Sequence, residues 1–453
     1  MRLAWFSPVP PVRSGVAGRS DELVRALRRR GHQIDIYVDD TLADESSRSA
    51  HDFPWRHLQQ PYDLTVYQFG NSSHHDYAWP YAFRYPGLAV LHETRLHHAR
   101  AALLLREKRV ADYRAEFAFN HPDKNPDLAE LAVAGFDSPL YYDWPMVRAL
   151  VHVSRLVAVH GNEAAADLNE RVPGVQDRIV AVRLGEGETL TPEREAEARR
   201  RIRAHHGISE DAVLFGCFGG LTPEKRIPQI LDALRATVSS APSARLMLAG
   251  APADHFDIAA EIRTRGPEDR VALTGYLESD ADLTDHLAAC DVSLNLRWPT
   301  ARETSGPWLR ALAASRPTIV TDLVHMGHVP SMDPRTWRMN FVGTRDPGSE
   351  AAVCISIDIL DEDHSLRLAM RRLAMDAELR TRLGQAAREW WQREHSVDVM
   401  VDDYLRAMDM ATKKTPAPVE LPRHLRDDGT ARLRALAEPF GVAAALSRDG
   451  FLE

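Results

Sequence analysis

Long apolar runs are missing from this chain of 453 residues. No run reaches the roughly 18 to 20 residues that cross a bilayer, so the sequence argues against a membrane-spanning helix. The first residues, MRLAWFSPVPP, carry one early arginine but no long apolar stretch, and they do not resemble a signal peptide. We therefore expect a protein that is made and kept in the cytoplasm.

Cysteine is scarce and shows no pattern of pairing. The three cysteines, Cys217, Cys290 and Cys354, are widely spaced and lie in apolar surroundings. Their odd number and the absence of a C-x-x-C pair argue against a disulfide framework and against a cysteine-based zinc site. A reducing compartment fits this usage best.

A surplus of basic residues is missing too. The 56 Lys and Arg are outnumbered by 65 Asp and Glu, which gives a formal net charge of −9. A nucleic-acid-binding protein usually carries a basic surplus, so we expect no nucleic-acid partner. The basic residues are almost all arginine. Arginine binds phosphate in a bidentate manner, but the base composition of a genome produces the same bias.

Motifs for metal and nicotinamide chemistry are also lacking. A histidine-rich region contains His74, His75, His92, His97 and His98. No carboxylate or cysteine completes a ligand set there at a usual spacing, and no Asp-x-Asp motif lies where a metal-dependent transferase needs one. The first loop lacks G-x-G-x-x-G, the fingerprint of nicotinamide cofactors. We expect neither a metal nor another cofactor.

Short apolar runs alternate with helical patterns along most of the chain. Apolar runs at 3–6 and 34–38 flank a helical pattern at 20–30, which is the spacing of a parallel crossover unit. After a polar, glycine-containing stretch at 185–192, the alternation begins again and continues to about residue 322. This pattern predicts an α/β protein with two doubly wound, Rossmann-like domains.

The same pattern predicts how the chain is divided. An N-terminal domain covers 1–185, a linker 186–198 and a second domain 199–394. Residues 395–412 are expected to form a helix that crosses back to the first domain. The tail at 413–453 has no assigned role, and disorder or a local packing arm are both compatible with its composition.

The most informative segment joins a predicted strand at 292–296 to the helix that follows it. The first turn of a helix offers free N–H groups and the positive end of its dipole, which together attract anions. Thr304 and Ser305 can cap this helix, and Gly306 leaves room for a ligand to approach the backbone. Glu303 stands at the carboxyl end of the strand, where its carboxylate can accept hydrogen bonds from sugar hydroxyls. An ordinary helix cap beside a solvated glutamate is the alternative.

A glycine pair, Gly219 and Gly220, follows the predicted strand at 213–218, and Lys225 comes shortly after it. Lys225 is therefore expected near the same edge of the sheet as Glu303. A lysine there can neutralise a diphosphate as it becomes a leaving group, which stabilises charge that develops in the transition state. An ordinary surface lysine is the alternative, although lysine is rare in this chain.

Several short motifs occur in order along the second half of the chain. They are Leu-x-x-Glu-Lys at 221–225, Leu-Met-Leu-Ala-Gly at 246–250, Val-x-Leu-x-Gly-Tyr at 271–276 and Arg-Ala-Leu-Ala-Ala at 310–314. With them, the run from 215 to 322 resembles the donor half of retaining glycosyltransferases of family 4, which have the GT-B fold. The N-terminal half is similar to the same family through Phe-Ser-Pro at 6–8 and the strand that ends at His92.

The resemblance implies roles for individual residues. It places His92 at the reaction centre, Lys225 on the donor diphosphate and Glu303 on the sugar hydroxyls, as the catalytic residues. The other residues expected to bind the donor are Gly15, Gly219, Arg226, Tyr276, Leu277, Thr304, Ser305, Gly306 and Arg310.

Two positions depart from the family pattern. A second glutamate, which contacts the ribose in the family, is replaced by Arg310. The arginine that the family carries in its glycine-containing loop is Gly220 in this chain. Ribose recognition and one half of the diphosphate clamp therefore lack their usual residues. Arg226 and Arg310 are the candidates to supply the missing charge.

The resemblance implies a metal-independent glycosyltransferase with two domains that face each other across a cleft. It would move a sugar from a nucleotide-sugar donor to a glycan, a lipid-linked glycan or a small molecule, with retention of configuration, in bacterial polysaccharide biosynthesis. Two alternatives stay open: a sugar-nucleotide epimerase or phosphorylase on the same fold, and a degenerate partner subunit that binds nucleotide or glycan.

The predicted helix at 20–30 ends in a cluster of arginines between Arg25 and Arg30. Such a cluster can touch anionic lipid, which would place the protein peripherally at the inner face of the membrane. A solvated basic helix face is the simpler explanation.

Overall fold

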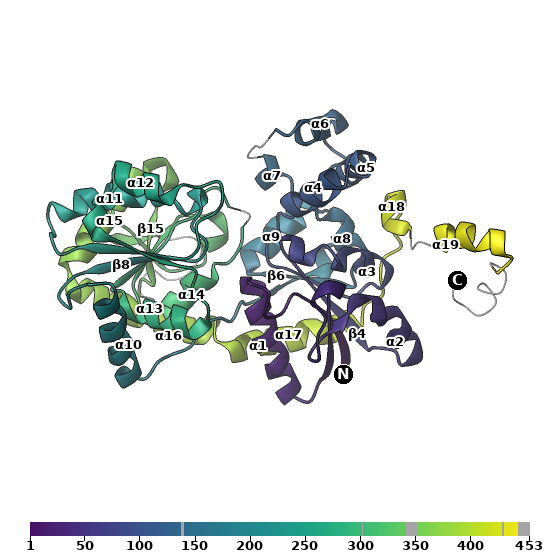
Figure 1. Ribbon diagram of the computed structural model, residues 1–453, viewed down its shortest axis with the longest axis horizontal. Helices are drawn as coiled ribbons and strands as arrows, with labels where there is room; N and C mark the ends of the chain where they lie inside the picture. The colour runs from purple at the N-terminus through teal and green to yellow at the C-terminus, as the bar shows by residue number, and fades with distance from the viewer. Residues whose placement is uncertain (137–139, 301, 341–350, 428–429, 443–453) are drawn as a thin grey trace. The chain divides into compact units, whose positions relative to one another are not determined.

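The computed structural model describes residues 1–136, 140–300, 302–340, 351–427 and 430–442. The chain forms two compact units. One comprises Met1–His160, Ala164–Val182 and the chain from Tyr404 onward, and the other comprises Gly161–Glu163 and Arg183–Asp403. Each unit contains one sheet with helices packed against it (Figure 1). The prediction of an α/β protein with two successive sheets is confirmed.

The first unit is built on a seven-stranded sheet in the order β3-β2-β1-β4-β5-β6-β7. Its strands are β1 (Arg2–Phe6), β2 (Gln33–Val38), β3 (Arg48–Ser49), β4 (Leu64–Phe69), β5 (Leu88–Leu91), β6 (Leu156–His160) and β7 (Ile179–Val182). The described strand pairs are all parallel. Strands β4, β5 and β6 are buried along their whole length, as expected for parallel strands covered on both faces.

The helices of the first unit come from the N-terminal part of the chain and from the tail. They are α1 (Gly15–Arg29), α2 (Phe53–Gln59), α3 (Ala78–Arg84), α4 (His97–Arg106), α5 (Val110–Asn120), α6 (Ala129–Val133), α7 (Leu140–Asp143), α8 (Arg148–Val153), α9 (Asn162–Arg171), α18 (Arg423–Arg426) and α19 (Thr430–Ala437). Helix α1 begins five residues before its predicted start because the Ser14 side chain accepts a hydrogen bond from the Ala17 N–H and caps it.

The second unit is built on an eight-stranded sheet in the order β10-β9-β8-β11-β12-β15-β13-β14. Its strands are β8 (Leu214–Phe218), β9 (Arg245–Ala249), β10 (Val271–Gly275), β11 (Val292–Asn295), β12 (Thr318–Thr321), β13 (Ser331–Asp333), β14 (Arg338–Asn340) and β15 (Cys354–Ile357). The pairing is parallel except for the antiparallel pair β13 and β14. The sequence did not predict these two strands at one end of the sheet, which are three residues long each.

Helices cover both faces of the second sheet (Figure 1). They are α10 (Pro192–His205), α11 (Ile227–Val238), α12 (Ile258–Arg265), α13 (Asp280–Ala289), α14 (Gly306–Ala313), α15 (Glu362–Met375) and α16 (Ala377–Glu394). Helix α17 (Val397–Thr412) belongs to the second unit up to Asp403 and to the first unit from Tyr404 onward. Strand β8 shows the two faces: Phe215 and Cys217 pack into one apolar cluster, whereas Leu214 and Phe218 pack into another. Burial of each such large side chain contributes about 1.5 to 3 kcal/mol.

The helical region at 362–394 is interrupted once. Helix α15 ends at Met375, and the Asp376 side chain accepts a hydrogen bond from the Leu379 N–H to cap α16.

Candidate functional site

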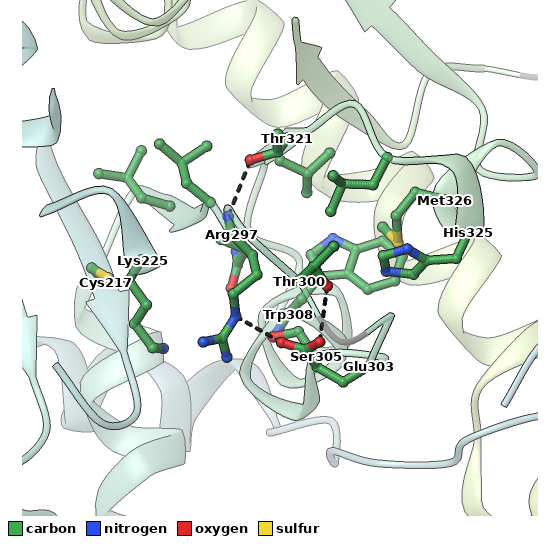
Figure 2. Close-up of a pocket in the computed structure, with 15 residues that line it drawn as sticks. Cys217, Lys225, Arg297, Thr300, Glu303, Ser305, Trp308, Thr321, His325 and Met326 are labelled. Carbon is green, nitrogen blue, oxygen red and sulfur yellow. Dashed lines mark hydrogen bonds and ion pairs between the residues drawn. The ribbon is translucent and has the colours of Figure 1, made fainter. Parts of the chain in front are cut away.

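A pocket opens in the second unit beside the ends of β8, β11 and β12 (Figure 2). The residues that line it are Cys217, Lys225, Leu294, Asn295, Leu296, Arg297, Thr300, Glu303, Ser305, Trp308, Val320, Thr321, Leu323, His325 and Met326. Its empty space is about 540 Å³, counted with the open mouth. The carboxyl ends of neighbouring parallel strands meet at this edge, so loops far apart in the sequence contribute to the pocket.

The loop between β11 and α14 forms one wall of the pocket. Ser305 caps α14 by accepting a hydrogen bond from the Trp308 N–H at 3.3 Å. The Trp308 side chain is only 2% exposed, and its indole N–H donates to the Thr318 hydroxyl at 3.2 Å. The start of the helix is therefore anchored to β12, which holds the preceding loop in place.

Glu303 lies in the pocket and its carboxylate has two partners. Oε1 forms an ion pair with Arg297 Nε at 2.8 Å, and Oε2 accepts a hydrogen bond from the Thr300 hydroxyl at 2.9 Å (Figure 2). The Glu303 side chain keeps 20% of its exposure. The structure thus places Glu303 where the sequence predicted it, with an oriented carboxylate that can accept further hydrogen bonds.

Lys225 ends a short 3₁₀ helix, Pro223–Lys225, and reaches the same pocket. Its ammonium donates a hydrogen bond to the carbonyl of Phe218, the last residue of β8. Burial lowers the pKa of Lys225 to about 8; the Arg297 charge also lowers it, while Cys217 and Glu303 oppose the shift. Lys225 is therefore mostly charged at neutral pH, but it loses its proton more easily than an exposed lysine does.

Gly219 shapes the loop that carries Lys225. It has a left-handed φ of +87°, and an added Cβ would lie 3.1 Å from Lys225 Nζ. Gly250, after the neighbouring strand β9, is needed for the same loop, because its Cβ would meet the Gly219 carbonyl oxygen at 2.2 Å. An added Cβ at Gly220 would meet nothing within 4 Å. The loop is tight at Gly219 and open at Gly220.

Two residues of the pocket, Arg297 and His325, were not assigned a role from the sequence. Arg297 lies two residues beyond β11, and His325 lies four residues beyond β12. His325 is 8% exposed, and its ring hydrogen-bonds to the backbone of Glu303. Burial lowers the pKa of His325 to about 4, so the ring is neutral at pH 7. The available signal was position: β11 and β12 are adjacent, so polar residues after both strands share an edge.

Arg226 is held outside this pocket. It adopts a left-handed conformation with φ +59°, and its guanidinium pairs with the Glu362 carboxylate of α15, with Nε at 2.9 Å from Oε1. The Glu362 side chain is 7% exposed. The structure therefore uses Arg226 to fix the Lys225 loop to α15, and it does not bring this arginine to the candidate donor site.

Arg310 is likewise occupied by other protein groups. Its Nε lies 2.9 Å from Glu186 Oε1, and its Nη2 lies 3.0 Å from Asp280 Oδ1. The side chains of Arg310 and Glu186 are 10% and 6% exposed. The Glu186 carboxylate also fills the space beside Gly306, where an added Cβ would lie 2.5 Å from it. The room that the sequence predicted for a ligand at Gly306 is taken by Glu186.

Three further predicted residues, Tyr276, Leu277 and Thr304, do not line the pocket in this structure. Tyr276 is 41% exposed, and Leu277 packs against an apolar cluster of the second unit. Thr304 is half-buried between Glu303 and Ser305. Their roles in donor binding stay predictions.

His92 and Gly15 belong to the first unit. His92 is 8% exposed; its Nε2 lies 2.8 Å from Gln68 Oε1 and its Nδ1 lies 3.1 Å from His160 Nε2. Burial lowers the pKa of His92 well below its usual value, so the ring is neutral. Gly15 begins α1 and is exposed. Both ring nitrogens of His92 thus have protein partners, and the roles of these two residues stay predictions.

Metal-binding clusters and membrane-spanning helices are absent from the described ranges. Across them, no group of three or more His, Cys, Asp or Glu side chains is arranged to hold a metal ion. In the same part of the chain, every helix is too short or too polar to cross a bilayer. Burial raises the pKa of the Cys217 thiol, so this pocket cysteine is a poor nucleophile.

The family match agrees with the position of the pocket. Residues 198–327 match the family model described as Glycosyl transferases group 1. This segment contains Lys225, Arg297, Glu303 and His325. A search of curated proteins found no match.

Solved structures show the same fold over most of the chain. Anabaena HepE, in complex with UDP and glucose, is 13% identical with a TM-score of 0.56, and covers 90% of this chain and 99% of its own. WaaG, a glycosyltransferase involved in lipopolysaccharide biosynthesis, is 15% identical with a TM-score of 0.56, over 90% and 99%. The catalytic domain of starch synthase IV from Arabidopsis thaliana, bound to ADP and acarbose, is 13% identical with a TM-score of 0.55, over 91% and 99%. The fold is therefore GT-B, as the resemblance implied.

Proposed function

We propose that this protein is a glycosyltransferase that moves a sugar from a nucleoside-diphosphate donor to a hydroxyl group. The observation that carries the proposal is the pocket in which Lys225, Arg297 and Glu303 meet, inside the segment that matches group 1 glycosyltransferases. Two cations can bind a diphosphate through charge-assisted hydrogen bonds, and a carboxylate can accept hydrogen bonds from sugar hydroxyls. HepE and starch synthase IV, which share the fold, were solved with UDP and ADP, and this supports a nucleotide donor.

In the proposed reaction the glycosidic bond to the diphosphate breaks as the acceptor hydroxyl attacks the anomeric carbon. Negative charge develops on the leaving diphosphate, and Lys225 stabilises it electrostatically. Glu303 holds the donor sugar through its hydroxyls. The leaving phosphate takes the proton of the acceptor, the configuration is retained, and no metal takes part. The lack of an activated nucleophile at Cys217 is consistent with direct transfer.

The proposed acceptor is a glycan or lipid-linked glycan of the bacterial cell envelope. The GT-B fold shared with WaaG, a protein of lipopolysaccharide biosynthesis, supports this setting. Contact of α1 with anionic lipid stays a prediction, which sedimentation with anionic vesicles measures. The exposed Arg25 already pairs with Asp21 at 2.6 Å, and Arg28 donates to the Ile34 carbonyl at 2.7 Å.

The first test is the effect of nucleotides on thermal stability. UDP, GDP, ADP and NAD are compared, with the sugar conjugates of each nucleoside diphosphate, with and without EDTA. A ligand at about 100 times its Kd adds about 2.7 kcal/mol to the stability of a state that alone binds it. We expect one nucleoside diphosphate to raise the melting temperature, and EDTA to leave the shift unchanged. Loss of the shift in EDTA would contradict metal independence.

The second test is transfer itself, with the stabilising donor and a panel of acceptors. Lys225→Ala is expected to lower kcat/KM by about 10²- to 10³-fold, the usual effect of removing one group that stabilises developing charge. Glu303→Ala should abolish most transfer, whereas Glu268→Ala, at an exposed position in the same unit, should not change it. Full activity of Lys225→Ala or Glu303→Ala would refute the role proposed for that residue. Nucleotide binding without transfer to any acceptor would favour the partner-subunit alternative.

A further inference from the structure

The pocket holds two side chains that are cationic at neutral pH, Lys225 and Arg297, close to one carboxylate, Glu303. Lys225 and Arg297 both line it, and the charge of Arg297 is near enough to lower the pKa of Lys225. Glu303 neutralises one of these charges through its ion pair with Arg297. Figure 2 shows the three side chains reaching toward the same part of the pocket, Lys225 from the segment after β8 and the other two from the loop between β11 and α14. The pocket as a whole therefore has a local positive excess that an anion can neutralise.

The loops that carry the two cations are joined by a backbone hydrogen bond. The N–H of Trp298, next to Arg297, donates to the carbonyl of Glu224, next to Lys225, at 2.8 Å. The N–H of Arg297 itself donates to the Thr321 hydroxyl at 3.1 Å. These hydrogen bonds hold the backbone at both cationic residues in place, while the two side chains project into the pocket.

The N-terminus of α14 is already compensated by a negative charge of the protein. The Glu186 carboxylate contacts Gly306, the first residue of α14, and is held there by its ion pair with Arg310. The backbone of Glu186 is fixed as well, because the Trp391 indole N–H donates to its carbonyl at 2.8 Å. A phosphate at this helix terminus would meet a buried carboxylate, so the charge of a bound diphosphate has to be met mainly by side chains.

We propose that Arg297 is the second phosphate-binding cation of the site and that it exchanges partners when the donor binds. Without donor, Arg297 pairs with Glu303. With donor, its guanidinium turns to the diphosphate beside Lys225, and Glu303 Oε1 becomes free to accept a hydrogen bond from a sugar hydroxyl. No covalent bond is made or broken in this exchange. The inference rests on the proposed function and names the residue that replaces the missing cation at Gly220.

Burial and partners distinguish Arg297 from the two arginines that the sequence suggested for this role. Arg226 pairs with Glu362, and Arg310 pairs with Glu186; both of these carboxylates are at most 7% exposed. Removing either arginine would leave a buried carboxylate uncompensated, which is strongly unfavourable. The Arg297 and Glu303 side chains are 34% and 20% exposed. The Arg297–Glu303 pair can therefore separate when the donor binds, because the diphosphate offers Arg297 a new partner and the sugar hydroxyls offer Glu303 one.

The exchange is tested by calorimetric titration of purified full-length protein with UDP, GDP and ADP, with the matching nucleosides and with inorganic pyrophosphate. The variants are Arg297→Gln, Arg297→Lys and, as a matched control, Arg263→Gln on the exposed side of α12. Arg297→Gln should raise the Kd of the nucleoside diphosphate about tenfold or more, the usual effect of losing a charged hydrogen bond. The Kd of the nucleoside should change less than twofold, Arg297→Lys should be intermediate, and Arg263→Gln should match the wild type.

A double-mutant cycle separates phosphate binding from a merely structural role of Arg297. In a Glu303→Gln background, Arg297→Gln should still weaken binding of the nucleoside diphosphate, because the phosphate contact does not depend on Glu303. No further loss in that background, or equal losses for nucleoside and nucleoside diphosphate, would overturn the inference. Unchanged binding by Arg297→Gln would overturn it too, with the proposed function intact. A wild-type protein that binds no nucleotide would overturn both.

Discussion

Lys225 illustrates how a single residue acquires its chemistry from its surroundings. Burial lowers its pKa from a usual value near 10.5 to about 8, and the neighbouring Arg297 adds to the shift. The folded protein therefore binds this proton less tightly than the unfolded chain does. Between pH 8 and 10.5 the unfolded state holds more of the proton, so the contribution of Lys225 to stability becomes more favourable as the pH rises. Ligand binding follows the opposite trend, because a diphosphate needs the charged form.

We therefore predict that the affinity for the nucleoside diphosphate falls as the pH rises through about 8. Above that value each pH unit should weaken binding by up to about tenfold, since binding must be accompanied by uptake of a proton. Lys225→Arg should remove this dependence, because arginine stays charged in this range. Titration calorimetry between pH 6.5 and 9.5 measures both proteins. A flat profile for the wild type would show that Lys225 does not titrate at the bound phosphate.

The pocket residues that the sequence did not reveal have a common property. Arg297 and His325 follow adjacent strands, and each acts on Glu303, one through the carboxylate and the other through the backbone. Neither belongs to a motif with a recognisable spacing. Both residues line the same pocket because β11 and β12 pair in parallel, with Leu294 opposite Ile319. Such partners depend on strand order, which is not visible in one sequence.

Helix α14 shows the same contrast at the scale of an element. Its start, its Ser305 cap and its place after a strand were predicted and are confirmed. The sequence could not show that the Glu186 carboxylate occupies the N-terminus of α14, because Glu186 comes from a segment more than a hundred residues earlier. Gly306 is needed in this position: its α-hydrogen leaves the space that the Glu186 carboxylate occupies.

Replacement of Gly306 by alanine should therefore destabilise the second unit. The new Cβ would lie 2.5 to 2.8 Å from the carboxylate of Glu186, which its ion pair with Arg310 prevents from moving freely. Overpacking of this kind costs about 1 to 3 kcal/mol. Urea denaturation measures the loss, and Gly220→Ala, with no atom within 4 Å of its Cβ, is the matched control, expected within about 0.5 kcal/mol of the wild type. A Gly306→Ala protein as stable as this control would contradict the close contact between Gly306 and Glu186.

At the scale of the whole molecule, the tail beyond residue 413 is partly a packing arm of the first unit. Leu421 is 6% exposed and belongs to that unit's apolar core. His424 Nε2 lies 2.9 Å from the carboxylate of Glu116, and Lys414 pairs with Asp177 at 2.7 Å. The sequence left disorder and packing open for this segment, and the structure shows packing for 414–425. The last eleven residues, 443–453, lie outside the described part of the chain.

Truncation after Lys414 should therefore destabilise the first unit without affecting nucleotide affinity. Loss of the buried Leu421 side chain alone costs about 1.5 to 3 kcal/mol. Truncation after Arg426 keeps Leu421 and His424 and should cost much less. Hydrogen exchange resolves the two units, and calorimetry measures the Kd for the nucleoside diphosphate. Equal exchange rates in the first unit of both truncated proteins would show that the arm contributes no stability.

The alternation of apolar runs and helical patterns determined most of this fold. Strands β1, β2, β8 and β11 begin and end within one residue of the apolar runs and strands predicted at 3–6, 34–38, 213–218 and 292–296, because their patterns are local. The position of Lys225 and Glu303 at one edge also follows from sequence, since the carboxyl ends of parallel strands share an edge. The small strands β13 and β14 were missed because segments of three residues carry almost no periodicity.

The tertiary structure alone decided which charges meet. Three arginines near the site, at 226, 297 and 310, look alike in the sequence, yet of these three only Arg297 lines the pocket. Arg226 finds its partner 136 residues away and Arg310 finds its partner 124 residues away. Over such separations the pairing depends on how helices pack on the sheet and on which carboxylates are buried there. The local sequence can place a charged residue at the end of a strand. Which oppositely charged residue it pairs with depends on the segments that the tertiary structure packs beside it.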